Sequence, residues 1–422
     1  MANWKLALPA VFALMLAGGA GSPALADDAA PAAGPAQSAQ PPARAKAADD
    51  SSSGVTLRLQ YTGEAAYNTG GLHDGGPYLN NIDAQLGVDA GRVFGWTGGK
   101  FLFEGFYNNA DSLNGRYVGA FQDPSAIDTE EGSLFRLYQA YYEQKIGGTN
   151  LLFGIYDLET EFAVTKPMDI FFNGEYAWNT ALDASGQNGP STYPNTSLAF
   201  RVRQRISSDW SVQAAVLDGA PDSTKYPNSN AITFSGVNGA LLIGEVDYTP
   251  TRTTKVMAGY WNYTGQFDAI NQTNSDGTQR EVFGSRGGYV GGATRLYSPG
   301  GHRGLDVFAN LGIAGSTTNE INGSFNVGLT YTGLLEDRPQ DKFGIATGVA
   351  QAGNAYKQAQ IAAGDRVSSY ENNFEVTYRA PINDWLTVQP DIQYWIHPGL
   401  DPSRKNDLLL MLHFEISHLF DL

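Results

Sequence analysis

The chain has 422 residues, of which 42% are hydrophobic and 17% charged, and its formal net charge is −16. This acidic balance argues against nucleic acid as a partner, because binding to phosphates needs a basic face. The absence of cysteine excludes a disulfide scaffold and a thiolate metal site, and it suits a protein that crosses an oxidising periplasm.

The N-terminal residues have the order of parts found in a secretory signal peptide. Lys5 is followed by an apolar run over residues 6–17, and residues 24–26 (Ala-Leu-Ala) form a small-x-small cleavage site. The apolar run is shorter than the roughly 20 residues that a transmembrane helix needs, which argues against a membrane anchor. We therefore predict a signal peptide at residues 1–26.

Residues 27–53 are rich in Ala, Pro, Asp and Ser and contain no aromatic residue. Such a segment cannot bury enough apolar surface to order itself, so we predict a flexible linker. The remaining residues, 54–422, contain no apolar run long enough to span a membrane as a helix. We expect them to form one folded domain.

Apolar and polar residues alternate in segments that recur from Val55 to the C terminus. This alternation predicts β-strands, because successive side chains of a strand point to opposite faces of the sheet. The predicted strands are 55–67, 79–91, 100–108, 134–145, 150–157, 195–206, 210–217, 238–249, 254–263, 287–297, 304–314, 324–335, 341–351, 369–380, 384–396 and 406–422.

Three features favour a membrane barrel over a soluble β-sandwich. The number of predicted strands is even, and most approach the roughly 9–11 residues that cross a bilayer. Long and short connections also take turns without exception, with short turns such as 207–209 and 381–383 on one rim. The longest connections, 109–133 and 158–194, fall on the other rim. We predict an all-β fold, a 16-stranded antiparallel transmembrane β-barrel with long extracellular loops and short periplasmic turns.

The segment 198–207 (LAFRVRQRIS) has an arginine at every second position and mostly apolar residues between. In a barrel of this size, the arginines would stand in water on the inner wall and the apolar residues would meet lipid. Acidic residues of other strands would share the same lumen, which gives a wet wall of mixed sign. The inward residues are Arg201, Arg203, Arg205, Glu245, Asp247, Glu371, Glu375, Asp391 and Glu415.

Two long blocks resemble the OprB-type carbohydrate-selective porins. They are residues 134–176 (LFRLYQAYYEQKIGGTNLLFGIYDLETEFAVTKPMDIFFNGEY) and residues 371–400 (ENNFEVTYRAPINDWLTVQPDIQYWIHPGL). The resemblance implies an outer-membrane channel through which monosaccharides such as glucose diffuse passively. It also implies that the connections 109–133 and 158–194 fold inward and narrow the pore.

The implied partners are small neutral sugars, outer-membrane lipid and lipopolysaccharide, and the assembly machinery of the outer membrane. Barrels of this membrane usually end in phenylalanine, and this chain departs from that pattern by ending in Leu422. The sequence leaves open which sugar is preferred and whether the channel is a monomer or a trimer.

A sugar offers hydroxyl groups that suit charged donors and acceptors, and a weakly apolar face that suits an aromatic ring. By strand phase and nearness to the two long connections, the candidate contact residues are Glu104, Arg136, Asp157, Trp178, Arg201, Arg203 and Trp395. The alternatives are a solvated wall for the charged residues, loop packing for Trp178 and an interfacial aromatic girdle for Trp395. Glu159 and Glu161 are expected to tie a loop to the wall.

The sequence contains no GxSxG, HExxH or P-loop motif, and its histidines lack the spacing of a metal site. We therefore expect no enzyme activity, no cofactor and no metal. A general or anion-preferring diffusion porin remains the alternative. An outer-membrane lipase is disfavoured because Ser417 and His418, as neighbours in a strand, face opposite sides. A secreted lectin would be soluble without detergent.

Overall fold

The computed structural model describes residues 53–109, 111–129, 133–221 and 237–422. The predicted signal peptide, and the predicted linker apart from Ser53, lie outside these residues. The strands are β1 (Val55–Gly71), β2 (Tyr78–Asp89), β3 (Gly99–Asn109), β4 (Ser133–Ile146), β5 (Thr149–Tyr156), β6 (Ser197–Arg205), β7 (Trp210–Asp218), β8 (Ala240–Thr251), β9 (Thr254–Thr273), β10 (Gln279–Gly300), β11 (Arg303–Ala314), β12 (Ile321–Thr332), β13 (Lys342–Ala352), β14 (Tyr370–Pro381), β15 (Leu386–Ile396) and β16 (Lys405–Asp421).

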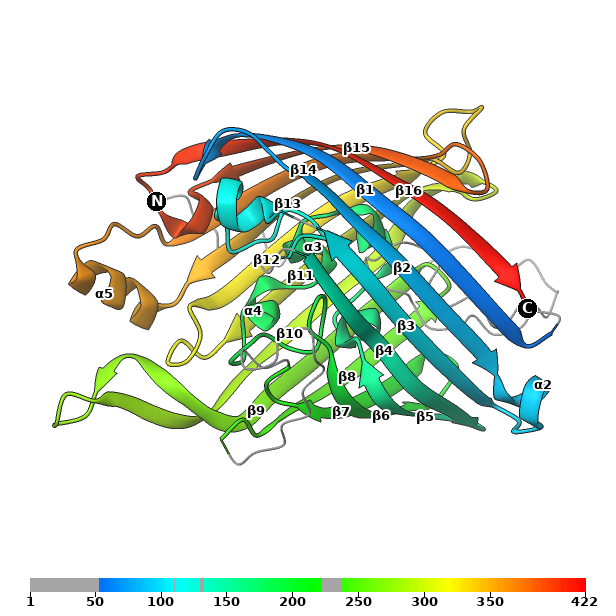
Figure 1. The fold of residues 1–422 in the computed structure, drawn as a ribbon, viewed down its shortest axis with the longest axis horizontal. Helices are drawn as coiled ribbons and strands as arrows, with labels where there is room; N and C mark the ends of the chain where they lie inside the picture. The colour runs from blue at the N-terminus through cyan, green and yellow to red at the C-terminus, as the bar shows by residue number, and fades with distance from the viewer. Residues whose placement is uncertain (1–52, 110, 130–132, 222–236) are drawn as a thin grey trace.

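These strands form one closed antiparallel barrel (Figure 1). Each strand pairs with its neighbours in the sequence, and β1 closes the barrel by pairing with β16 from Thr56↔Asp421 to Gly71↔Lys405. Closure leaves no sheet edge unpaired, which a sheet inside a bilayer requires. The predicted fold class is confirmed, because every predicted strand overlaps an observed one.

Two neighbouring strands are much longer than the sequence pattern indicates. β9 and β10 continue past the predicted ends at residues 263 and 287, and they form a hairpin that projects beyond the rim (Figure 1). The extra segment is rich in Gln, Asp, Asn and Thr, so its composition resembled a loop. Cross-strand hydrogen bonds hold it as a ribbon all the same.

The strict alternation of long and short connections is wrong at two places. Residues 90–98 form a longer connection than residues 72–77 on the opposite rim, and residues 333–341 a longer one than residues 315–320. The first exception contains α2 (Ala90–Phe94), which Asp89 caps by accepting a hydrogen bond from the backbone N–H of Arg92.

Side chains alternate between the outer and inner faces along each strand, as in β16. Leu408, Leu410 and Leu412 are between 38% and 48% exposed on the outside, whereas His413 and Glu415 are buried on the inside. No helix in the described part of the chain is long and apolar enough to span a membrane. The apolar outer face is the face that a barrel turns to lipid.

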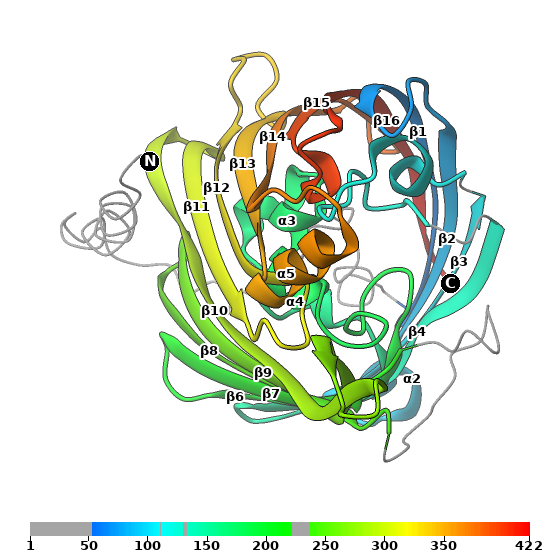
Figure 2. The ribbon, with the colours of Figure 1, turned by 90° about the vertical axis from the view of Figure 1, so that its left-hand side faces the viewer.

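Two long connections lie inside the barrel (Figure 2). The second loop (residues 110–132) packs against β1 through a helical turn, Asn114–Val118. The third loop (residues 157–196) crosses to the wall of β10–β13 and contains the turns Leu158–Thr160 and Lys166–Ile170 and the helices α3 (Gly174–Ala177) and α4 (Thr180–Asp183). A further helix, α5 (Asn354–Ala363), lies in the connection between β13 and β14.

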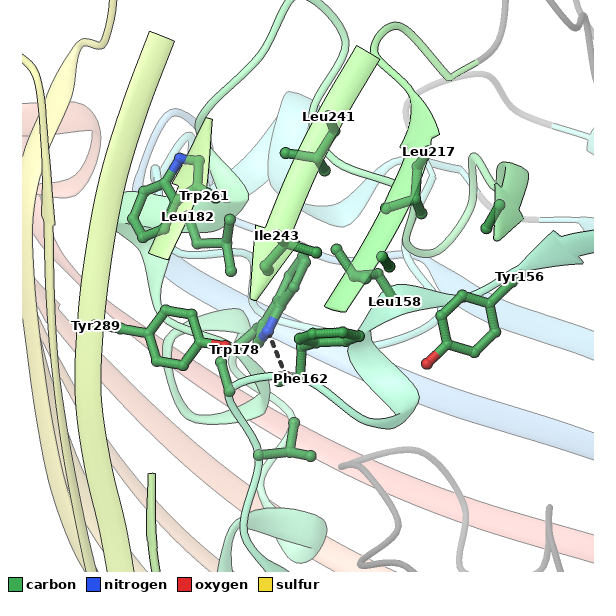
Figure 3. Close-up of a cluster of buried hydrophobic side chains, with 14 of the residues drawn as sticks. Tyr156, Leu158, Phe162, Trp178, Leu182, Leu217, Leu241, Ile243, Trp261 and Tyr289 are labelled. Atoms are coloured by element: carbon green, nitrogen blue, oxygen red, sulfur yellow. Dashed lines mark hydrogen bonds between the residues drawn. The ribbon is translucent and has the colours of Figure 1, made fainter. Parts of the chain in front are cut away.

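An apolar core fills the lumen between the third loop and strands β5–β10 (Figure 3). The expectation of a wet inner wall all round is therefore wrong on this side. The reason is that inward positions facing the third loop are apolar, such as Leu217 on β7, Ile243 on β8 and Trp261 on β9, although Gln213 and Glu245 share these inner faces. The labelled members of this core are Tyr156, Leu158, Phe162, Trp178, Leu182, Leu217, Leu241, Ile243, Trp261 and Tyr289.

Candidate functional site

The arginine stripe of β6 does face inward, but its first member is not in water. Arg201 is 0% exposed, its Nη2 donates to Glu161 Oε1 at 2.9 Å, and its Nε lies 2.8 Å from Glu161 Oε2. Arg203 Nη1 lies 3.3 Å from Glu161 Oε1. Glu161 belongs to the third loop, so the prediction that this glutamate ties a loop to the wall is confirmed.

The two arginines control the charge of Glu161. Burial favours the neutral carboxyl, but the guanidiniums of Arg203 and Arg201 outweigh it and lower the pKa of Glu161 below its ordinary value. The carboxylate is thus ionised at neutral pH and, together with Glu143 at 3.6 Å from Arg201 Nη2, balances the charges of Arg201 and Arg203. Arg201 is therefore a structural partner of the loop.

The acidic candidates are also engaged in contacts within the protein. Glu104 is 0% exposed and accepts hydrogen bonds from the side-chain amides of Gln85 (3.3 Å) and Gln139 (2.7 Å). Asp157 accepts from the hydroxyl of Tyr138 at 2.5 Å and starts the first turn of the third loop. Both carboxylates lie in side-chain networks where the wall meets the third loop.

The remaining candidates are buried as well. Trp178 is 2% exposed and its indole N–H donates to the carbonyl oxygen of Phe162 at 2.8 Å within the third loop (Figure 3). Trp395 faces inward at 0% exposure and packs in a cluster with Leu113 and Val118 of the second loop. Arg136 on β4 is also 0% exposed. These environments match the packing alternative for Trp178, whereas a sugar contact by any of them stays a prediction.

A polar cavity lies on the side of the lumen opposite the apolar core. It lies between the two inward loops and strands β1, β2 and β14–β16, and the volume open to the centre of a water molecule is about 40 Å³. The residues lining this cavity that carry charge or an aromatic ring are Arg58, Asp83, Asp169, Phe171, Phe172, Tyr193, Arg379, His413 and Glu415. Within the described residues, it brings together none of the candidate contact residues chosen from the sequence.

Charges of both signs are paired around this cavity. Arg379 Nη2 donates to Glu415 Oε2 at 3.1 Å, and Glu415 Oε1 lies 3.3 Å from His413 Nε2. The other ring nitrogen of His413 lies 2.8 Å from Glu64 Oε1. The centroid of the Phe172 ring lies 4.7 Å from the centroid of the His413 ring. An apolar ring therefore lies beside this network. The cavity thus offers donors, acceptors and an aromatic face within one space.

The sequence held a signal for part of this cavity. Phe171 and Phe172 form an aromatic pair inside the longest connection, and Arg58 has the inward phase of its strand. Strand phase and nearness to the long connections predict which side chains point into the lumen. They do not predict which part of the wall a loop packs against. No group of three or more Asp, Glu or His side chains able to hold a metal occurs in the described ranges of the chain.

A closed 16-stranded barrel with an apolar outside and two loops folded into its lumen is the architecture of a porin. A family model, carbohydrate-selective porin, OprB family, matches residues 73–417. The chain therefore belongs to the OprB family of carbohydrate-selective porins and is an outer-membrane protein.

Individual relatives agree with this assignment. Porin B of Pseudomonas aeruginosa is 26% identical over 382 residues, which cover 82% of this chain and 84% of that protein. The high-pH structure of Pseudomonas putida OprB has a TM-score of 0.79 at 23% identity and covers 87% of this chain and 94% of that chain. The outer membrane channel DcaP of Acinetobacter baumannii has a TM-score of 0.51 at 13% identity, covering 86% and 97%. These relatives are channels and not enzymes.

Proposed function

We propose that the protein admits monosaccharides such as glucose by passive diffusion, through a water-filled lumen that the second and third loops narrow. The cavity between these loops and strands β1, β2 and β14–β16 is the observation that carries this proposal. Its paired charges suit sugar hydroxyls, and Phe172 suits the apolar face of a sugar ring. Weak contacts of this kind let the solute leave again, as a channel requires.

The charge distribution favours a neutral solute over an anion. Glu161 and Glu143 together balance the charges of Arg201 and Arg203, so these arginines are not available to attract anions. In the cavity, Glu415 lies against Arg379 in the same way. An anion-preferring porin needs an excess of positive charge at its narrowest part, and these pairs remove it.

The proposal extends to the partners implied by the resemblance. The outer face of the barrel is apolar and meets membrane lipid, including lipopolysaccharide in the outer leaflet. Insertion there would use the outer-membrane assembly machinery. The contacts of Arg201, Arg203 and Trp178 described above support a role in holding the third loop at the pore.

Reconstitution into liposomes tests the proposal. Swelling rates are compared for glucose, a disaccharide, a neutral amino acid and gluconate, with empty liposomes as the control. We expect glucose to enter fast and solutes of similar size, gluconate above all, to enter much more slowly. Permeation ordered by size alone would leave a general diffusion porin, and faster gluconate permeation would leave an anion-preferring one.

A further inference from the structure

Two glutamates on the inner face of β14 are not part of a wet wall. Glu371 and Glu375 are both 0% exposed, although they lie on a strand whose inner face was expected to meet water. Each is covered by a loop that arrives from far away in the sequence. Their carboxylate oxygens accept hydrogen bonds from the backbone of those loops.

Glu375 holds the third loop at the point where that loop borders the cavity. Its Oε1 accepts from the backbone N–H of Phe172 at 2.8 Å, and its Oε2 from that of Asn173 at 3.0 Å. Phe172 lines the cavity, so the position of this carboxylate fixes the position of a cavity wall. Each of the two carboxyl oxygens accepts a hydrogen bond from one of two successive backbone N–H groups. A side-chain amide has only one acceptor oxygen and cannot accept both bonds in this way.

Glu371 does the same for two other connections. It accepts from the backbone N–H groups of Phe121 (3.0 Å) and Gln122 (2.9 Å) in the second loop. It also accepts from the backbone N–H of Gly399 at 2.6 Å, in the connection between β15 and β16. One buried carboxylate therefore joins the second loop to the wall and to a neighbouring loop.

The residue between the two glutamates completes a row. Asn373 faces inward at 0% exposure, and its Oδ1 accepts from the hydroxyl of Tyr176 at 2.7 Å. Tyr176 belongs to α3 of the third loop. On the far side of the lumen, Glu245 of β8 accepts from the backbone N–H of Ala163 at 2.7 Å. The third loop is thus fastened at both ends of its path across the barrel.

We propose that Glu371, Asn373 and Glu375 form a positioning row on β14 that fixes both inward loops and thereby sets the size limit of the channel. The proposal deepens the proposed function, since it rests on these loops narrowing the pore. It does not depend on which sugar the channel prefers. The row acts through the loops, and its residues need not contact the solute.

The test compares Glu375→Gln, Glu371→Gln and the combined variant with the parent protein in liposomes. The probes are uncharged sugars of increasing size, namely glucose, sucrose and the trisaccharide raffinose. A glutamine keeps one acceptor but turns an N–H group toward a backbone N–H, so the loops lose their fixed position. We expect the ratio of raffinose to glucose permeation to rise several-fold in each single variant and further in the combined one.

A matched control makes the same substitution outside the lumen. Glu336→Gln removes an acidic charge from a side chain that is 88% exposed on the turn between β12 and β13, and it is expected to leave the ratio unchanged. Heat-modifiable mobility in gel electrophoresis shows that each variant has closed its barrel. Should Glu375→Gln not fold, Glu375→Asp keeps the carboxyl group but withdraws it by one methylene, and the ratio is then expected to rise less.

A folded Glu375→Gln or Glu375→Asp barrel with the size ratio of the parent would overturn the proposal. This outcome is separate from a failure of the proposed sugar preference. If the parent protein admits gluconate as readily as glucose, the preference is wrong, while a raised raffinose ratio in the variants still supports the positioning row.

Discussion

The two sides of the lumen differ in how they use the inward positions of the strands. On the side of β5–β10, inward residues such as Ile243 and Trp261 are apolar, and the third loop packs on them as in the core of a soluble protein. On the side of β1, β2 and β14–β16, inward residues such as Arg379 and His413 are polar and border an open cavity. The first side holds the third loop by apolar packing, whereas the second side holds both loops by hydrogen bonds to Glu371 and Glu375 and also borders the cavity.

Ion pairs follow the same division. Arg201 is fully buried against Glu161, so its charge stabilises the position of the third loop. Arg379 also pairs with a glutamate, but this pair lines the cavity. Substitution of Arg201 should therefore loosen the third loop, and substitution of Arg379 should change selectivity with the loop in place.

The largest effect is expected from Trp178→Ala in the apolar core. Removing a fully buried tryptophan costs about 3–5 kcal/mol, and the loss falls on the third loop, since the barrel closes without it. We expect external chymotrypsin to cleave the third loop after Phe172 or Tyr176 much faster in the variant than in the parent, as mass spectrometry of the fragments would show. Trp385→Ala, at a side chain 51% exposed on the turn rim, is the matched control. Equal cleavage rates in parent and variant would show that the core does not hold the loop.

Arg201→Ala should have the next largest effect. The substitution leaves Glu161 buried without its nearest charge partner, which costs about 3 kcal/mol. We expect faster cleavage of the third loop and a noisier single-channel current, with the barrel still folded. Adding Glu161→Gln should restore part of the protection, and Arg203→Ala alone should do less because Arg203 is partly exposed. A double variant no better than Arg201→Ala would contradict the pairing.

Arg379→Ala is expected to act on solutes and not on the loop. It removes a positive charge from the cavity and a charge-assisted hydrogen-bond donor of about 1–2 kcal/mol, so glucose permeation should fall several-fold. The reversal potential in a salt gradient should shift toward cation selectivity. Protease protection of the third loop is the internal control, and it should stay at the level of the parent. If glucose flux and ion selectivity do not change, Arg379 is part of the solvated wall and does not contact the solute.

The smallest effect is a pH dependence that comes from α3. Burial raises the pKa of Glu175 from 4.5 to about 8. The folded loop therefore binds this proton more tightly than the unfolded loop, and its stability falls as pH rises from about 4.5 to 8. We expect slightly faster cleavage of the third loop at pH 8 than at pH 6, and Glu175→Gln should reduce that difference. Asp183 of α4, whose pKa burial raises to about 6, contributes less in this range.

Glu161 provides the contrasting case within the same loop. Its folded pKa lies below the ordinary value, so its contribution is fully present above pH 4.5 and is lost only as the solution becomes more acidic than that. Glu161 should therefore not contribute to any change in the cleavage rate between pH 6 and pH 8. A pH dependence in that range that is as large in Glu175→Gln as in the parent would refute the assignment to Glu175.

Much of the fold is readable from the sequence. Alternation in β16 separates Leu408 and Leu410 from His413 and Glu415, and the structure places these pairs on opposite faces as predicted. The same rule misses the extra length of β9 and β10, because a polar ribbon beyond the membrane has no apolar face to mark it. The resemblance to the family correctly pointed to the connections that fold inward.

The sequence by itself determined the strands, their inward and outward faces and the two long connections, because a period of two is a local property. Only the tertiary structure decided which inward groups meet water. Glu375 receives its hydrogen bond from Phe172, 203 residues away in the chain. Strand phase predicts that a side chain points into the lumen. Whether that side chain binds another part of the protein or faces a solute depends on whether a loop folds over it.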